Sequence, residues 1–277
     1  MRTWRRVSVG NVVFTLFGVL WLIIGCYPVF YILTTSLRSQ NGYLLGNPWV
    51  PPLHPTFQNY EQVIQSGFVK AFVNSAIVSV ATVVLIVLFS LLLSYVVVRT
   101  RNRVVRTVFN WFVVGLAIPV QAAIIPVYIL ITKLGLYDTL LGMILPMVAF
   151  ALPLSTLILV NFVRDIPNEL YEAMGIEGAN DFQIVFRLVA PLARPALISV
   201  AVYQFVQSWN NFLFPLVLTQ SANVRVLPLA IVQFQGEHTM DVPVTMAAVV
   251  FSAIPLFLAY IFGGRYLRQG MLAGFGK

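Results

Sequence analysis

Six long apolar stretches of this chain contain no Asp, Glu, Lys or Arg, and the shortest of them is 23 residues long. A charge at the centre of a membrane-spanning helix costs about 2.5–3.5 kcal/mol on insertion scales, so spanning helices are expected to fall between charges. A span needs about 20 apolar residues, and every stretch is long enough. The stretches are residues 7–37, 71–98, 107–132, 139–163, 195–224 and 242–264. A seventh charge-free stretch, residues 39–60, contains four prolines and is expected to be extended and not to span a membrane.

The composition excludes an ordinary soluble domain. Hydrophobic residues make up 59% of the chain and charged residues 9%, whereas soluble domains are about 45–50% apolar and about 25% charged. We therefore predict an all-α, multi-pass membrane protein that forms one membrane domain over residues 1–277. The six spans are expected at about 12–35, 71–98, 108–131, 140–163, 196–219 and 243–264.

The net charge of +8 is distributed unevenly between the loops. If the spans are as predicted, 13 of the 17 basic residues lie on one side of the membrane, and Lys and Arg gather in cytoplasmic loops. Both chain termini are therefore predicted to be cytoplasmic. The 13 residues are Arg2, Arg5, Arg6, Arg99, Arg101, Arg103, Arg106, Arg164, Arg187, Arg194, Arg265, Arg268 and Lys277.

The basic charge does not point to nucleic acid, because no basic stripe is interleaved with aromatic residues on a polar face. The two histidines, His54 and His238, lie in loops and no Cys/His cluster accompanies them, so no metal site is expected. The single cysteine, Cys26, lies in an apolar run and is expected to be a buried thiol.

One polar segment, residues 165–195, stands out and is called the polar loop below. It carries five of the nine acidic residues. Asn180 followed by Gln183 has the spacing of a helix capping box. Gly175 and Gly178 bracket a turn in which positive φ is expected. The segment is therefore predicted to hold two short helices joined by a glycine turn.

Each short helix is expected to present an apolar face with an acidic rim, which would fit a cleft in a soluble partner. The alternative is an interfacial helix resting on lipid head groups, but anionic lipid would repel the net negative charge. The expected faces are Leu170, Ala173 and Met174 in the first helix, and Phe182, Val185, Phe186 and Val189 in the second.

The spacing of the polar loop resembles the EAA loop of ABC-importer permeases. That pattern is Glu-Ala-Ala, three residues, Gly, nine residues, Ile, one residue and Leu-Pro. Three positions depart from it and all three stay apolar: Met174, Leu188 and Ala190. The residues at the motif's positions are Glu172, Ala173, Met174, Gly178, Leu188, Ala190 and Pro191.

Further stretches are similar to the carbohydrate branch of that family, close to the maltose-type second permease subunit. They are Asn59-Tyr60, Asn74-Ser75, residues 125–128, 134–136, 209–212, Pro215-Leu216 and residues 270–277. The resemblance implies a bacterial or archaeal cell-membrane complex. Its other members would be a second permease subunit, two nucleotide-binding subunits and an extracytoplasmic solute-binding protein.

The same resemblance implies that the polar loop docks on the nucleotide-binding subunits. The residues expected in that contact are Glu172, Ala173, Met174, Gly178, Ala179, Phe182, Val185, Phe186 and Pro191. The chain has no G-x-x-x-x-G-K-[ST] phosphate-binding loop. This subunit is therefore expected to be non-catalytic and to bind no cofactor, with ATP and Mg held by its partners.

The fifth span contains the densest set of polar side chains: Gln204, Gln207, Trp209, Asn210 and Asn211. Gln204, Gln207 and Asn211 share one helical face at i, i+3 and i+7. Amides beside a tryptophan suit neutral hydroxylated ligands, so these residues are candidates for a transport pathway. Amides also hold membrane helices together, and this alternative stays open.

Two other classes of protein remain as alternatives. An ion-gradient-driven transporter usually carries ionisable residues inside its spans, and the six stretches contain no Asp or Glu. A membrane interaction protein without transport would explain the polar loop. It would not explain the seven prolines in the predicted spans, which favour a moving bundle.

Overall fold

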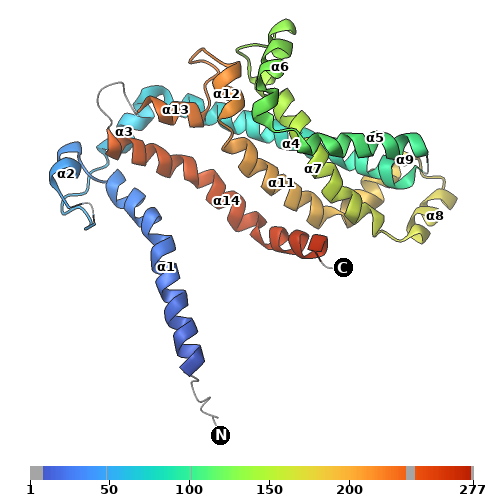
Figure 1. Ribbon diagram of the computed structural model, residues 1–277, viewed down its shortest axis with the longest axis horizontal. Coiled ribbons are helices and arrows are strands. Elements are labelled where there is room, and N and C mark those ends of the chain that lie inside the picture. The colour runs from blue at the N-terminus through green and yellow to red at the C-terminus, as the bar shows by residue number, and fades with distance from the viewer. Residues whose placement is uncertain (1–8, 48, 101, 235–240, 276–277) are drawn as a thin grey trace. The chain divides into compact units, whose positions relative to one another are not determined.

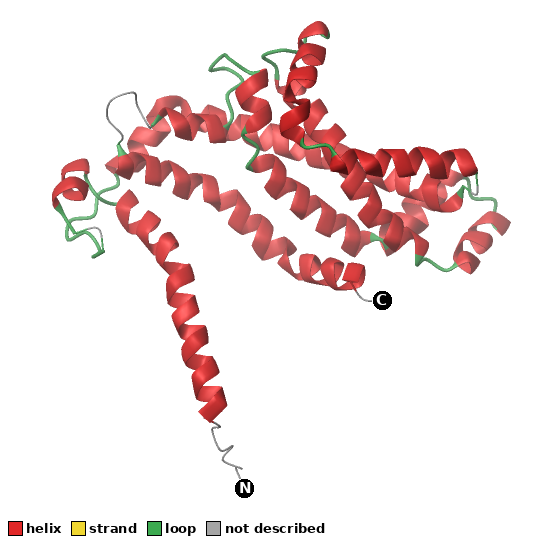
Figure 2. Ribbon diagram, in the orientation of Figure 1, coloured by secondary structure: helices red, strands yellow, loops and turns green. Residues whose placement is uncertain are grey.

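The computed structural model describes residues 9–47, 49–100, 102–234 and 241–275. Every regular element within these residues is a helix (Figure 2), so the all-α prediction is confirmed. Several residues used in the sequence predictions lie outside the described residues: Arg2, Arg5, Arg6, Arg101, His238, Gly276 and Lys277.

The chain forms two compact units. The first unit comprises the residues up to Phe68 together with Ile231–Ala253. The second comprises Val69–Ala230 and the residues from Ile254 onward. Two helices cross the boundary, α13 (Leu227–Gln233) and α14 (Val242–Phe275).

The first unit is arranged around the end of α1. Its own elements are α1 (Val9–Ser36), α2 (Gln40–Leu45), α3 (Gln58–Val63) and the π-helical turn η1 (Ile64–Phe68). The Asn59 side-chain amide donates to the carbonyls of Ser36 and Arg38, at 2.7 Å each. These bonds satisfy carbonyls at the C-terminal end of α1, which have no partner within the helix. Cys26 lies exposed on α1, so the predicted burial of its thiol is wrong.

The second unit contains the long helices that carry the candidate sites (Figure 1). Its elements in chain order are α4 (Val69–Arg99), α5 (Arg103–Val114), η2 (Gly115–Ala117), α6 (Val120–Lys133), α7 (Leu140–Arg164), α8 (Asn168–Ile176), α9 (Asp181–Ile184), η3 (Val185–Val189), α10 (Ala190–Leu192), α11 (Arg194–Trp209) and α12 (Leu213–Leu218).

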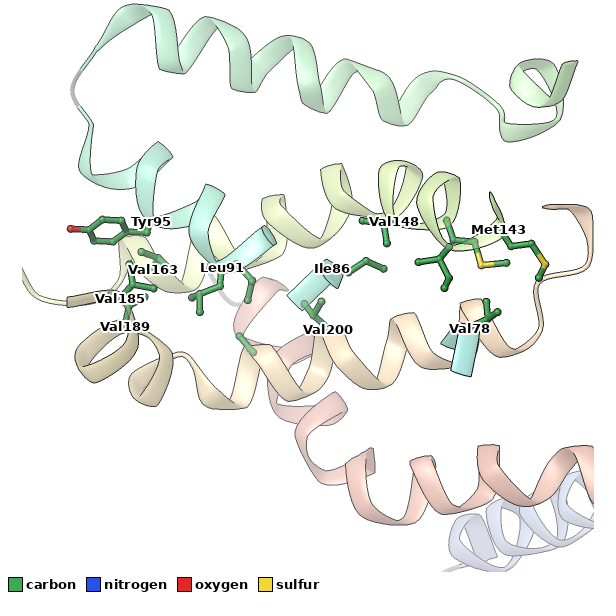
Figure 3. Close-up of a cluster of buried hydrophobic side chains, with 14 of the residues drawn as sticks. Val78, Ile86, Leu91, Tyr95, Met143, Val148, Val163, Val185, Val189 and Val200 are labelled. Atoms are coloured by element: carbon green, nitrogen blue, oxygen red, sulfur yellow. The ribbon is translucent and has the colours of Figure 1, made fainter. Parts of the chain in front are cut away.

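The core of the second unit lies where α4 packs against α7 and α11. Figure 3 shows Tyr95, Val185 and Val189 at one end of this core and Val78 and Met143 at the other. Small serines, including Ser90 and Ser94, are also buried along α4. Small residues let membrane helices approach closely, which explains why this contact is the largest in the unit.

Four helices are long and apolar enough to cross a membrane: Gly10–Ser36, Gln58–Arg99, Leu140–Arg164 and Val242–Gly264. Two further pairs of helices qualify if each bent pair counts as one span. Length and composition therefore support four to six spans within the described residues. Two of the six predicted spans are not continuous helices.

The predicted span 108–131 is interrupted. The chain bends by 108° between the helical segments Arg103–Ala117 and Val120–Lys133. Pro119 precedes α6 and has no N–H to donate to an α5 carbonyl. Ile118, the residue before this proline, is extended, as the proline ring requires. Proline chemistry therefore converts the predicted helix into an elbow.

The predicted span 196–219 is also broken, because α11 ends at Trp209 and α12 begins at Leu213. The Asn210 side chain donates to the carbonyl of Val206 at 2.9 Å. Asn211 Oδ1 accepts from the N–H of Phe214 at 3.2 Å. These two amides satisfy backbone groups that a break in a membrane helix would otherwise leave unpaired.

Candidate functional site: a polar loop and an amide-lined cavity

The polar loop folds as short helices joined by a tight turn. Asn180 Oδ1 accepts from the N–H of Gln183 at 2.9 Å, and Gln183 Oε1 accepts from the N–H of Asn180 at 3.0 Å. The predicted capping box is therefore confirmed. Gly178 has the expected positive φ, +76°. Gly175 instead belongs to the last turn of α8.

The first helix of the loop is held against the end of α4 by Arg99. Its guanidinium lies 4.2 Å from the centre of the Tyr171 ring, and Nη1 donates to Asn168 Oδ1 at 3.0 Å. A guanidinium over an aromatic ring is a favourable cation–π contact. Tyr171 itself is buried, which raises the pKa of its phenol. The buried face of α8 is thus built on Tyr171, whereas Leu170 and Ala173 of the predicted face are exposed.

The second helix of the loop is held by Tyr95, one turn before Arg99 on α4. The Tyr95 hydroxyl donates to Asp181 Oδ1 at 2.6 Å. Asp181 is the first residue of α9, where a carboxylate is also favoured by the helix dipole. Both halves of the loop are therefore attached to the same end of the same long helix.

The apolar residues of the second helix divide into two rows. Val185 is only 2% exposed and packs into the core with Val189. Phe182 and Phe186 lie on the surface, with ring centres 4.5 Å apart. The predicted single face is wrong because residues 185–189 form a π-helical turn, whose wider period separates the Val185–Val189 row from the Phe182–Phe186 row. Val185 is therefore not available to a partner.

The exposed side of the loop carries apolar and acidic groups together. We call the exposed group Glu172, Ala173, Ile176, Phe182 and Phe186 the docking surface, after the role predicted for this loop. Ile176 is 88% exposed and Phe182 is 68% exposed. Ile176 is not among the residues predicted for docking, although a β-branched apolar residue between Gly175 and Glu177 is a usable signal.

The remaining predicted docking residues fall at the edge of this surface. Gly178 and Pro191 are exposed. Met174 and Ala179 are half-buried and pack against the core of the second unit. These two side chains therefore support the loop from within.

A cavity of about 230 Å³ lies between α4, α7 and α11. Gln204, Gln207 and Asn211 all line it, as their i, i+3, i+7 spacing predicts. The other lining residues are Thr82, Ile86, Leu116, Val120, Met147, Phe150, Ala151, Leu154, Tyr203, Ser208 and Phe214. None of the lining side chains is charged.

Polar groups lie on two levels of this cavity. Gln204 is buried, and its amide nitrogen donates to Ser155 Oγ at 2.9 Å. Gln207 is exposed, and its amide nitrogen donates to the Tyr203 hydroxyl at 2.9 Å. Thr82 Oγ1 is buried without a hydrogen-bond partner in the described part of the chain.

The other two candidates in this segment have different surroundings. Trp209 is buried, with the ring of Phe205 stacked on it at 5.5 Å and the edge of Phe72 at 5.4 Å. Asn210 caps the end of α11 through Val206. Neither residue lines the 230 Å³ cavity, so the set proposed from the sequence reduces to three amides there.

The described residues include no group of three or more His, Cys, Asp or Glu side chains that could hold a metal.

Comparison with known proteins identifies the family. Residues 86–272, which include the polar loop and the cavity-lining helices α7 and α11, match the model of the binding-protein-dependent transport system inner membrane component. The chain belongs to this family. The match confirms the resemblance carried by the EAA-like spacing, and it identifies the protein as a multi-pass permease of the cell membrane.

Two relatives cover most of this permease. The diacetylchitobiose uptake system permease protein NgcG of Streptomyces coelicolor is 33% identical over 87% of the chain and 81% of its own length. The glucose import system permease protein GlcU of Saccharolobus solfataricus is 30% identical over 100% of the chain and 98% of its own length.

A solved structure shares the fold of the permease. A chain of a bacterial alginate ABC transporter, in complex with an alginate pentasaccharide-bound periplasmic protein, superposes with a TM-score of 0.68. The similarity covers 97% of this chain and 98% of the other at 16% sequence identity.

Proposed function

We propose that this chain is the permease subunit of an ATP-driven importer of a sugar or oligosaccharide and forms half of its translocation pathway. The names of the relatives support the solute class, because one belongs to a diacetylchitobiose uptake system and the other to a glucose import system. The cavity supports it as well, because amide and hydroxyl groups without charges suit neutral hydroxylated solutes.

In this proposal the membrane contains six spans: the bent pair α5–α6 counts as one span, and α11 together with α12 counts as another. Both termini and the polar loop are cytoplasmic. The uneven distribution of basic residues supports this orientation. The partners are a second permease subunit, two ATPase subunits and an extracytoplasmic solute-binding protein. ATP and Mg are bound by the ATPase subunits.

One observation carries the mechanism: an exposed apolar surface lies on a loop that is attached twice to α4, through Tyr95 and through Arg99. The docking surface would seat in the ATPase subunit, with the Phe182 and Phe186 rings packed in its cleft and Glu172 in a polar contact. Closure of the ATPase subunits would then displace α4 together with the loop.

Cysteine crosslinking tests this proposal directly. Ala173 is exposed on the docking surface, so Ala173→Cys is introduced in a Cys26→Ser background and paired with single cysteines in the ATPase subunit. We expect a crosslink whose yield changes when ATP is added. The matched control is Ala222→Cys, an exposed position in the loop after α12, which should give no crosslink.

A well-expressed complex that gives no crosslink at position 173 would contradict the docking role. Such a result would favour a transporter driven by an ion gradient or a membrane protein with another partner. A crosslink whose yield does not change with nucleotide would support docking of the loop on the ATPase subunit. It would contradict a role of the loop in transmitting the ATPase motion.

A further inference from the structure

We infer that this permease contacts the transported solute itself and that the cavity lined by Gln204, Gln207 and Asn211 holds one ring of a neutral, polyhydroxylated molecule. The inference rests on the proposed function and adds to it a location and a chemical class. The alternative is a pathway lined by the partner permease alone.

The charge of the lining sets the class of solute. The cavity's 14 lining residues include no Asp, Glu, Lys, Arg or His. A charged solute without a counter-charge would lose its hydration without compensation. A neutral solute with hydroxyl groups can exchange hydrogen bonds to water for bonds to amides.

The arrangement of the polar groups suits hydroxyls at two depths. Gln207 and the Tyr203 hydroxyl lie at the exposed level, where a solute would first be met. Gln204 lies at the buried level and donates to Ser155 through its nitrogen. Its amide oxygen has no hydrogen bond from any described residue, so it can accept one from a solute hydroxyl.

The buried level also contains an unsatisfied hydroxyl. Thr82 lines the cavity from α4, and its Oγ1 has no partner in the described part of the chain. An unpaired buried hydroxyl is energetically unfavourable, because it has lost its hydrogen bonds to water. A solute hydroxyl or a water in the cavity, met after a rotation of the Thr82 side chain, would remove that cost.

The apolar part of the lining fits the flat face of a sugar ring. Phe150 and Phe214 line the cavity with ring centres 5.7 Å apart, and Phe214 is buried. Ligand sites usually combine such apolar walls with a few polar groups that fix orientation. The volume of about 230 Å³ is below the range of about 300–1,000 Å³ typical of ligand sites. This chain would therefore supply one wall and hold one ring.

Protection from labelling tests the inference in the whole transporter. Gln207→Cys is introduced in the Cys26→Ser background, and the complex is reconstituted with both ATPase subunits, the partner permease and the solute-binding protein. Labelling by a small methanethiosulfonate reagent is measured with glucose, with N,N′-diacetylchitobiose and with glucuronate. Uptake of the two neutral sugars is measured in vesicles that contain the Cys26→Ser transporter with Gln207 intact.

The transported sugar should slow labelling about tenfold when present at roughly ten times its dissociation constant, because only unoccupied sites react. Glucuronate at the same concentration should not slow it. Gln62→Cys, an exposed position on α3, is the matched control and should label at one rate throughout.

Because Gln207 is exposed, this substitution leaves the core unchanged. Uptake without protection would overturn the inference and leave the proposed function standing. Protection by glucuronate equal to that by the sugar would overturn the assignment to neutral solutes. If neither sugar is taken up while the Ala173→Cys crosslink still responds to ATP, the sugar assignment fails and the inference fails with it.

Discussion

The hydroxyl of Tyr95 lies 2.6 Å from Oδ1 of Asp181, although 86 positions separate the two residues in the chain. Tyr95 belongs to the core of the second unit, whereas Asp181 begins a helix of the polar loop. This hydrogen bond therefore joins the packed helices of the permease to the segment that is proposed to receive the ATPase motion.

Replacing Tyr95 by Phe removes this bond while keeping the ring in the core. A hydrogen bond to a charged group contributes about 1.5–3 kcal/mol when buried, and less here because Asp181 is exposed. We expect the amount of solute moved per ATP hydrolysed to fall several-fold, because the loop follows α4 less closely. Reconstituted vesicles give this ratio. Tyr137→Phe is the control, since its hydroxyl has no hydrogen bond to the described residues, and an unchanged ratio in Tyr95→Phe would contradict the proposal.

Replacing Arg99 by Lys keeps the charge but loses the planar contact with Tyr171 and the bond to Asn168. The loss of about 1 kcal/mol should let the amides of residues 168–176 exchange with deuterium about fivefold faster. Hydrogen exchange measured by mass spectrometry reports this change. The control is Arg103→Lys, at an exposed site on α5, which should leave the exchange rate of the α8 amides unchanged. Equal exchange rates in both variants would contradict the proposal that Arg99 holds α8 against α4.

We expect Phe182 to contribute to binding of the ATPase subunit and Val185 to contribute to the stability of the fold. Phe182→Ala should weaken binding of the ATPase subunit by at least about tenfold and leave the melting temperature unchanged, because exposed aromatic anchors dominate interfaces. Val185→Ala should lower stability by about 2 kcal/mol, because it removes two buried carbon atoms from the core. Pull-down with the ATPase subunit and thermal unfolding in detergent separate the two effects. Weaker ATPase binding in Val185→Ala, with an unchanged melting temperature, would mean that Val185 contacts the partner.

Glu172 is exposed on the docking surface and is predicted to make a polar contact with the ATPase subunit. Glu172→Lys reverses that charge and should abolish solute uptake while the protein still inserts into the membrane. Uptake assays and membrane fractionation measure the two properties. Glu61→Lys reverses an exposed charge on α3 and should retain uptake; loss of the Glu172→Lys protein from the membrane would mean that this residue acts in folding.

Asp138 provides a prediction on pH. Its carboxylate accepts from the N–H groups of Gln220 and Ser221 at 2.8 and 2.9 Å, and these bonds hold its pKa below the ordinary value of 3.8. A group with a lowered pKa stabilises the folded state above its unfolded value and stops doing so as the pH falls through the folded value. Asp138→Asn should therefore melt at a lower temperature than the wild type at pH 7. The difference in melting temperature should shrink and disappear as the pH falls below 3.8 and through the lowered pKa of Asp138. A difference that persists at such acidic pH would contradict the role of the charge.

The sequence was sufficient to predict what depends on composition and local spacing. Charge-free stretches predicted the apolar helices, and Asn180 with Gln183 predicted a capping box that the structure contains. The contacts of Tyr95 with Asp181 and of Arg99 with Tyr171 could not be predicted, because nothing in one sequence specifies a pair so far apart.

Two errors have a local physical origin. The interruptions at Pro119 and at Asn210-Asn211 lie inside two predicted spans, because apolar length alone does not show where the backbone hydrogen bonding of a helix ends. An ideal α-helical period places Val185 on the same face as Phe182 and Phe186. Residues 185–189 instead form a π-helical turn, which has more residues per turn than an α-helix.

The exposure of Ile176 and Phe182 has a consequence for the life of the subunit in the cell. A newly made copy without its ATPase partner would expose these apolar side chains to water, as an unfolded protein does. Chaperones and quality-control proteases act on such surfaces, so orphan copies should be removed while assembled copies survive. The same few side chains that are proposed to receive mechanical force would thereby also set the stoichiometry of the complex.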